Sequence, residues 1–472
     1  MKYLFLPACG RMEDVGVVLI NSLYLNLLVK FYNYGATKFN FRRILLLIKN
    51  ETIDLMRKLI VCLLVVTAAA GCKKIEVVPV TETPTDSGPL PAQQMPAMLP
   101  RRVAFGAEGD IAKSAQFIAE SDYQYQYLSG DIFSNGWTTW NAPDGEFARN
   151  FLNRVSQMGK VPVFTYYNLV PAKNRFEDPA FTNMNDAEVM KRYFDDFKFL
   201  LQICGAFAKP VIIHYEPDLM GYMEMYRNDA AKSSIKVSQS GQPDVQGFSN
   251  NAKGLFEAIV AMRNKYAPNV LLGWHASQWA TGNNLVVDKH NPEQLGKETA
   301  DYYKSLHAPF DLIFSEFSDR DAGYDEVVMG KTNVEWSAIA SAANGNLSDY
   351  SRFQRFLKTL NQQTGQKIIL WQIPVGNTFT KTCNNTPGHY KNNTAEFFLQ
   401  QVLAGGTADN IASYGQAGVI AFLFGRGAAN CTSYMDDRHD DADAPNETAD
   451  DDGGYLRKGI RAYYQKGVVA VQ

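Results

Sequence analysis

The sequence has little of several features that identify common classes of protein. Six cysteines among 472 residues are too few to form a disulfide-stabilised scaffold. The formal net charge is only −3, so nothing in the composition indicates a nucleic-acid partner. The six histidines include no His-x-His and no His-Glu-x-x-His pattern, and we expect neither a metal ion nor another cofactor. Gly-x-Ser-x-Gly is also absent, so the sequence lacks the nucleophile motif that would indicate a hydrolase of esters or amides.

The chain does contain enough apolar sequence for one large domain or two ordinary ones, because 46% of its residues are hydrophobic. One apolar run lies near the N-terminus, where the chain reads MRKLIVCLLVVTAAAGCKK from Met56. Arg57 and Lys58 precede the apolar core at 59–66, and small residues then lead to Ala69-Ala70-Gly71-Cys72. This apolar run is shorter than the ~20 residues that a membrane-spanning helix needs.

The order of charge, apolar core and small residues resembles a bacterial lipoprotein signal peptide. The resemblance implies that residues 56–71 are removed and that Cys72 is lipidated, so we do not expect residues 1–55 to belong to the natural product. It also implies anchoring in a bacterial cell envelope, at the outer membrane of a Gram-negative host because Lys73 follows the cysteine. Residues 72–100 are rich in proline, which predicts an extended tether between the anchor and the domain.

Short apolar runs alternate with helical segments throughout residues 101–472. Eight strands separated by helices predict a single (β/α)8 barrel with long loops after the strands. We expect the strands at 102–106, 125–132, 161–167, 211–216, 270–275, 311–316, 367–373 and 418–425. We expect the helices at 146–158, 186–207, 252–266, 292–305, 350–364, 394–404 and 455–465. An open doubly wound sheet is the alternative, but residues 105–110 lack the glycine-rich turn that usually follows its first strand.

Two of the expected strands end in acidic residues. Pro217 and Asp218 follow the strand at 211–216, and proline cannot donate to a sheet, so we expect Glu216 to be the last strand residue and Asp218 to lie in a loop. The strand at 311–316 ends in Glu316. Because the C-terminal ends of the strands carry the active site of a (β/α)8 barrel, we expect Glu216 and Glu316 to share one pocket.

Glycosidic cleavage commonly needs one carboxylic acid as proton donor and a second carboxylate as nucleophile or base. We expect Glu216 and Glu316 to have these roles, with a raised pKa on Glu216 because less polar residues surround it. Carboxyl groups about 5–5.5 Å apart would indicate retention of configuration, and about 6.5–9.5 Å inversion. Asp218, Asp319 and His275 are expected to support the pair.

Aromatic and amide side chains gather at the same strand ends, and five of the six tryptophans lie at or just after the ends of strands, with only Trp336 elsewhere. Flat aromatic faces beside acids and amides suit sugar rings. We therefore expect a substrate cleft lined by Trp137, Trp140, Tyr166, Tyr167, Tyr222, Trp274, Trp279, Trp371, Gln372 and Arg426. His214 lies two residues before Glu216 on the same side of the strand, so we expect it to be a buried support one layer deeper.

Two further features lie in the loops after the last strands. Cys383 and Cys431 fall in neighbouring loops, and in an exported protein they are expected to form a disulfide bond. Eight aspartates between residues 436 and 452 could bind calcium, but the EF-hand spacing and its closing glutamate are missing. A solvated acidic loop is the expectation for this segment.

The expected barrel, with Glu216 at its fourth strand, resembles the (β/α)8 glycoside hydrolases, a group that includes many cellulases and related endo-glycanases. Glu216-Pro217-Asp218 is also similar to the Glu-Pro-Asp of the cellobiohydrolase family that is built on a distorted barrel. The chain departs from the commonest barrel clan in two places. Tyr215 stands where that clan has asparagine, and the seventh strand, Leu370-Trp371-Gln372-Ile373-Pro374, lacks the clan's acidic nucleophile.

The resemblance implies an exported, lipid-anchored glycoside hydrolase that acts on a poly- or oligosaccharide. The alternative is a non-catalytic surface lipoprotein that binds glycan in the same cleft.

Overall fold

The computed structural model describes most of the chain from residue 95 onwards. The described residues are 95–109, 120–175, 180–286, 288, 290–316, 336–342, 345–373, 393–425 and 455–471.

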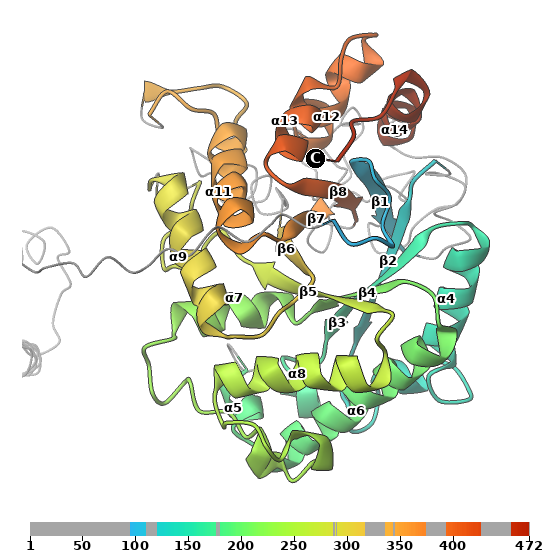
Figure 1. Cartoon of the computed structure of the whole chain (residues 1–472), viewed down its shortest axis with the longest axis vertical. Coiled ribbons are helices and arrows are strands. Elements are labelled where there is room, and N and C mark those ends of the chain that lie inside the picture. The colour runs from blue at the N-terminus through green and yellow to red at the C-terminus, as the bar shows by residue number, and fades with distance from the viewer. Residues whose placement is uncertain are drawn as a thin grey trace, which may run out of the picture. The chain divides into compact units, whose positions relative to one another are not determined.

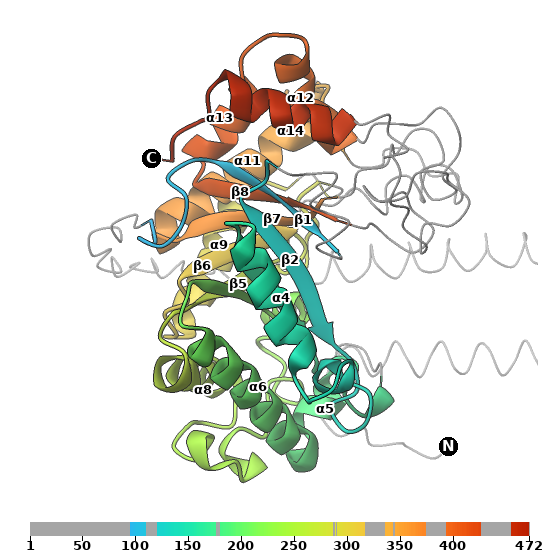
Figure 2. The ribbon, with the colours of Figure 1, turned by 90° about the vertical axis from the view of Figure 1, so that its right-hand side faces the viewer.

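Eight parallel strands pair in sequence order and close into a barrel, because β1 also pairs with β8 (Figures 1 and 2). The strands are β1 (Ala104–Glu108), β2 (Tyr123–Ser129), β3 (Val161–Tyr167), β4 (Val211–Tyr215), β5 (Val270–Ala276), β6 (Leu312–Glu316), β7 (Lys367–Ile373) and β8 (Val419–Phe424). The predicted (β/α)8 barrel is therefore confirmed. We call the rim formed by the C-terminal ends of these strands the mouth.

Helices surround the strands (Figures 1 and 2). The longer ones are α4 (Glu146–Gln157), α6 (Ala187–Phe207), α7 (Pro217–Met225), α8 (Ala252–Tyr266), α9 (Pro292–Ser305), α11 (Asp349–Thr364), α12 (Asn393–Leu403), α13 (Asp409–Gln416) and α14 (Tyr455–Lys466). Several begin at a polar side chain that accepts from backbone N–H groups of the first turn, as Asp186 and Ser348 do for α6 and α11.

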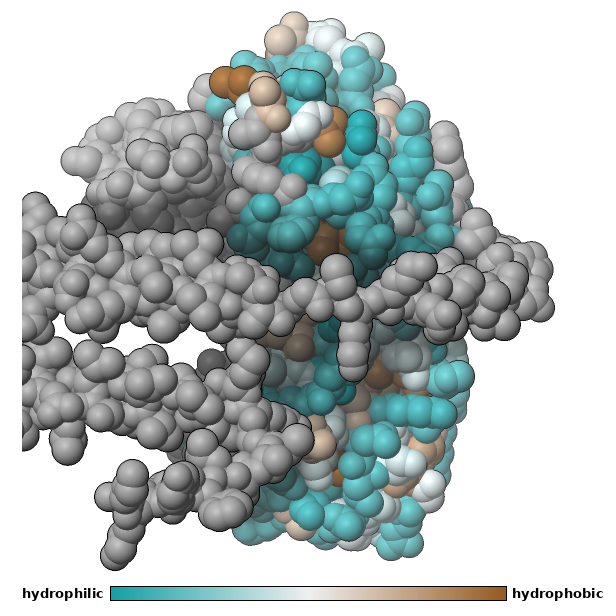
Figure 3. Space-filling view, turned by 90° about the vertical axis from the view of Figure 1, so that its left-hand side faces the viewer, coloured by the Kyte–Doolittle hydropathy of each residue, from teal (hydrophilic) through white to brown (hydrophobic). Residues whose placement is uncertain are grey.

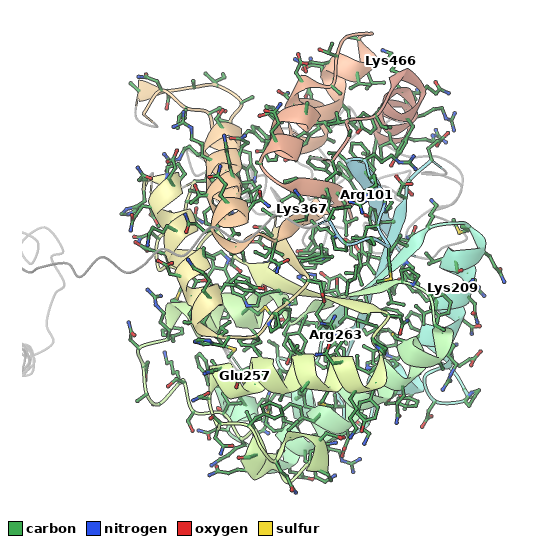
Figure 4. All side chains as sticks on the ribbon, viewed as in Figure 1. Arg101, Lys209, Glu257, Arg263, Lys367 and Lys466 are labelled. Carbon is green, nitrogen blue, oxygen red and sulfur yellow. The ribbon has the colours of Figure 1, made fainter. Side chains whose placement is uncertain are left out.

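Alternation along the strands divides the apolar side chains into two layers. One layer fills the barrel interior and includes Tyr123, Ile212, Phe314 and Trp371. The other layer lies between the strands and the helices and forms the larger cluster. Polar side chains also bind the helices to the strands. Arg263 of α8 donates to the carbonyl of Val270 at 2.6 Å and forms an ion pair with Asp311, which binds the helix to β5 and to the start of β6 (Figure 4).

The last helix covers the first strand and so completes the ring of helices beside β1. The Tyr463 hydroxyl of α14 donates to the Val103 carbonyl at 2.8 Å, and the Tyr464 hydroxyl accepts from the N–H of Phe105 at 3.1 Å. Leu99, just before the first strand, is buried with the interior layer.

The expected strand limits at 161–167 and 367–373 and the helix limits at 252–266 and 292–305 are those of the structure. Among the longer helices of the described residues, α7 directly after β4 and α13 before β8 were not expected. Within the described part of the chain, no helix is long and apolar enough to cross a membrane. The coloured part of the face in Figure 3, which shows the described residues, is mainly hydrophilic with small scattered hydrophobic patches.

Candidate active site

The fourth strand ends one residue earlier than expected, and the correction concerns Glu216 and Asp218. Glu216 adopts a left-handed backbone conformation (φ 39°, ψ 65°) at the N-terminus of α7, and Asp218 lies in the first turn of that helix rather than in a loop. Pro217 explains both features. Proline is favoured at the first helical position, and it also disfavours the right-handed helical region for the residue before it.

The Glu216 carboxyl group is fully enclosed, with none of the side chain exposed. Its Oε1 accepts from the backbone N–H groups of Asn168 at 2.9 Å and Leu169 at 3.1 Å. Tyr193 of α6, which belongs to the outer layer, lies beside it. The expectation that Glu216 faces the cleft is therefore wrong, because the turn before Pro217 directs its carboxyl toward α6.

Burial raises the pKa of Glu216 to about 8, against the opposing effect of the two backbone donors. The direction is the one expected for a general acid, since the group keeps its proton at neutral pH. No described residue is hydrogen-bonded to its Oε2 atom. The catalytic role of Glu216 stays a prediction.

Asp218 is the acid of this segment that lies at the mouth, where it is half-buried. Burial and the neighbouring charge of Asp218 raise the pKa of the Tyr167 hydroxyl, which places Tyr167 of β3 next to this carboxylate. Tyr222 follows Asp218 by one helical turn and so lies on the same face of α7. Its ring packs against Trp279 with 4.9 Å between the ring centroids.

Gly221 allows this face of α7 to approach the segment after β5. A Cβ atom at Gly221 would lie 2.6 Å from Cη2 of Trp279 and 2.7 Å from Oγ of Ser277. Contacts this short do not occur between folded side chains, so the glycine is required for the Tyr222–Trp279 pair.

Glu316 is the last residue of β6 and is half-buried, as a substrate-facing acid at the mouth would be. A second strand-end acid, Glu108 of β1, was not among the expected site residues. Glu108 is also half-buried and accepts from the Tyr125 hydroxyl at 3.1 Å. The expected strand at 102–106 ended two residues before Glu108, so this acid was missed although it ends its strand as Glu316 does.

The seventh strand contributes Ile369 and Trp371 to the barrel interior. Gln372 has a positive φ of 54° and interrupts the pairing of β7 with β8, and its amide donates to the Tyr127 hydroxyl at 3.1 Å. Trp371 is buried in the interior layer, where its ring packs edge-on against His214 and tilted against Tyr127. The strand register pairs Trp371 with Glu316, so Trp371 lies at the level of that acid and Gln372 one residue nearer to the end of its strand, although both side chains are buried.

Three of the expected cleft residues belong to the outer layer instead, and the structure corrects them. Trp137 and Tyr166 are fully buried, and both donate at 2.8 Å to the Asp196 carboxylate of α6. Trp274 is fully buried against Tyr303 of α9. The physical reason is the strand period of two, because Tyr166 and Trp274 each neighbour an inward-facing residue and so point outward.

The remaining expected aromatic residues keep exposed surface. Trp279, Tyr167 and Tyr222 are half-buried at the mouth. Trp140 is 40% exposed in the connection between β2 and α4, where its ring meets Phe147 edge-on.

His214 and His275 are both buried in the barrel interior, and His214 Nε2 lies 2.9 Å from His275 Nδ1. The expectation that His214 is a buried, hydrogen-bonded support is confirmed.

Several expected residues lie outside the described part of the chain. They are Asp319, Arg426, the acidic segment 436–452, Cys72 and the cysteine pair Cys383 and Cys431. Among the residues that the structure does describe, no group of His, Cys, Asp and Glu side chains could hold a metal ion. Cys204, on α6, is a buried free thiol.

No protein-family model matches the sequence, and no curated protein matches it. Solved structures with a similar fold include a GH26 beta-mannanase from Bacteroides ovatus, at 10% identity and a TM-score of 0.43 over 79% of this chain and 91% of the mannanase. They also include a GH53 catalytic domain from Ignisphaera aggregans, at 10% identity and a TM-score of 0.41 over 79% of this chain and 98% of that domain. A GH5 xyloglucan-specific beta-1,4-glucanase from a ruminal metagenomic library has 13% identity and a TM-score of 0.41 over 75% of this chain and 86% of its own. At this level of identity the similarity is one of fold.

Proposed function

We propose that this chain is a glycoside hydrolase whose substrate binds at the mouth of the barrel. The observation that supports it is the set of half-buried acids at three strand ends, Glu108 of β1, Asp218 after β4 and Glu316 of β6, together with the Tyr222–Trp279 pair that follows β4 and β5. Because all eight strands are parallel, these groups share one rim. At such a rim an aromatic pair can stack on a pyranose ring, and the acids can act on its glycosidic bond.

In this proposal Asp218 and Glu316 are the carboxyl groups that contact the scissile bond. One of them donates a proton to the leaving oxygen, and the other acts as nucleophile or as base on a water. Glu216 lies behind Asp218, and the charge of Asp218 contributes to the raised pKa of Glu216. With Glu216 neutral at pH 7, Asp218 can stay ionised without a second buried charge next to it.

A competing assignment makes Glu216 the general acid, because its pKa of about 8 holds a proton at neutral pH. This assignment requires the loop at Asn168 and Leu169, whose N–H groups bind Oε1, to move and expose the carboxyl.

The test is a screen of the protein against a panel of polysaccharides, followed by kinetics of Glu316→Gln, Asp218→Asn and Glu216→Gln. We expect the first two variants to lose at least about 100-fold in kcat, the size of effect general acid–base groups usually have. Glu257→Gln is the matched control, because Glu257 lies on α8, away from the mouth (Figure 4). Full activity of Asp218→Asn together with an inactive Glu216→Gln would assign the acid to Glu216 instead.

The alternative function is glycan binding without catalysis, by the same mouth. Calorimetry separates the two functions. A binding protein would retain sugar at the mouth with no release of reducing ends, and Asp218→Asn or Glu316→Gln would change only its affinity.

We also propose that Cys72 carries a lipid anchor and that the protein acts at a bacterial cell envelope. The support is the sequence from Met56 to Lys73, in which charge, apolar core and small residues occur in the order of a lipoprotein signal. Incorporation of a labelled fatty acid into the protein, and its loss in Cys72→Ala, tests this part independently of activity.

A further inference from the structure

Two histidines form a hydrogen-bonded pair in the barrel interior below the mouth. His214 Nε2 lies 2.9 Å from His275 Nδ1, and on the other side of the first ring His214 Nδ1 lies 3.4 Å from Thr165 Oγ1. The contacts therefore run from β3 through β4 to β5 in a continuous chain.

The strand register shows that the two histidines of this hydrogen-bonded series lie at different depths in the barrel. His214 pairs with Gly273, so His275 lies two residues nearer to the C-terminal end of its strand. His275 in turn pairs with Phe314, two residues before Glu316. His275 retains 1% of its surface and His214 none. His275 is thus the upper member of the pair, and its Nε2 atom faces away from the deeper layer that holds His214.

Packing holds both rings in place. The Phe314 ring stacks on His214 with 4.1 Å between centroids and an angle of 6°, and Trp371 meets both imidazoles edge-on. Gly273 makes the Phe314 stack possible, because a Cβ atom there would lie 2.3 Å from the Phe314 ring. With both rings fixed, the positions of the protons are the remaining variable.

Burial lowers the pKa of His275 to about 3 and that of His214 well below its usual value, so both rings are neutral at working pH. Each neutral ring has one N–H and one bare nitrogen. The 2.9 Å contact takes one proton. If it sits on His214 Nε2, then His214 Nδ1 accepts from Thr165, and the proton of His275 must be on Nε2. If the proton instead sits on His275 Nδ1, His214 Nδ1 donates to Thr165, and His275 Nε2 carries no proton.

The acids at the mouth decide between the two directions. Asp218 follows β4 and Glu316 ends β6, the two strands that flank β5, so the field there favours an N–H bond pointing toward them over a lone pair. We propose that His214, oriented by Thr165, is a positioning residue that holds His275 with its proton on Nε2, as a donor to an oxygen of the bound sugar. The identity of that acceptor rests on the proposed function, whereas the tautomer does not.

The experiment is ¹⁵N NMR of the full chain labelled at histidine. Long-range ¹⁵N–¹H correlations distinguish a protonated from a bare ring nitrogen, and only six histidines contribute signals. His275→Asn identifies the His275 signals. We expect Nε2 of His275 to be protonated and Nδ1 bare between pH 5 and 8.

Thr165→Val removes the hydroxyl that determines the donor–acceptor direction of the hydrogen bonds through His214 to His275, with little change in volume. We expect both nitrogens of His275 to shift toward intermediate values as the second tautomer becomes populated. His214→Phe, which keeps a ring against Phe314, should release His275 further. Thr364→Val is the matched control, because Thr364 is another buried threonine that binds only its own helix end. A His275 protonated on Nδ1 in the wild type, or identical His275 signals in Thr165→Val and Thr364→Val, would overturn the proposal.

Once a glycan that the protein hydrolyses has been identified, kinetics test separately whether an oxygen of the sugar accepts from His275. His275→Phe removes the donor and should lower kcat/KM at least tenfold, whereas His275→Asn keeps an N–H group and should retain more activity. Equal kcat/KM in the wild type and His275→Phe would refute the contact with sugar. If no glycan is bound or cleaved, the proposed function fails while the tautomer measurement keeps its meaning.

Discussion

Replacing Glu216 by glutamine should make the protein more stable at neutral and alkaline pH. The carboxyl group is fully buried, and burial raises its pKa from 4.5 to about 8. Glutamine has the shape of the protonated carboxyl and keeps an oxygen for the N–H groups of Asn168 and Leu169. The variant therefore removes the titration while preserving the local hydrogen bonds.

The sign follows from proton binding in the two states. Between pH 4.5 and about 8 the folded protein keeps a proton on Glu216 that the unfolded chain has released. The free energy of unfolding therefore falls as the pH rises through this window. At 1.36 kcal/mol per pKa unit, the shift corresponds to ~4 kcal/mol lost by pH 8, where the folded carboxyl is half ionised, and ~3 kcal/mol lost by pH 7.

Urea unfolding followed by tryptophan fluorescence at pH 5, 6, 7 and 8 measures the effect. Wild type and Glu216→Gln should be similar at pH 5 and should separate by a few kcal/mol at pH 8, with the glutamine variant more stable. Asp196 and Glu224 also have pKa values raised by burial, to about 6 and about 7, and they titrate in both proteins. The difference between the variants isolates Glu216. Parallel pH dependences, or a glutamine variant less stable at pH 8, would refute the burial argument.

Three further predictions concern the mouth and the N-terminus. Gly221→Ala places a Cβ atom within 2.7 Å of Trp279 and Ser277, so we expect a loss of roughly 1–3 kcal/mol in the free energy of unfolding; unchanged urea midpoints would contradict the close approach of α7. Trp279→Ala should weaken glycan binding at least tenfold by calorimetry, about 1.4 kcal/mol, while Trp336→Ala, which removes a buried ring against α11, should lower stability and leave affinity unchanged. Cys72→Ala should abolish incorporation of labelled fatty acid, and incorporation that survives the change would show that the cysteine is not the lipidated residue.

Much of the fold could be predicted from the sequence, because each βα unit has a local signature. The apolar runs at β3 and β7 and the amphipathic segments at α8 and α9 were predicted with the limits that the structure has. Alternation of eight such strands with helices leaves few arrangements other than a closed parallel barrel. The segment after β4 was predicted less well. Pro217 was interpreted as the end of a strand, but the same residue is equally suited to begin a helix.

The sequence by itself determined which chemistry is available at the strand ends: acids, amides and aromatic rings after strands four, five and six. Only the tertiary structure decided which of these groups face the mouth. A single residue of offset along a strand turns Trp274 toward α9 and His275 into the barrel. The left-handed turn at Glu216 directs one acid toward α6 and leaves Asp218, two residues later, at the rim. Side-chain direction depends on backbone angles and on register with the neighbouring strand, and neither is contained in the identity of the residue.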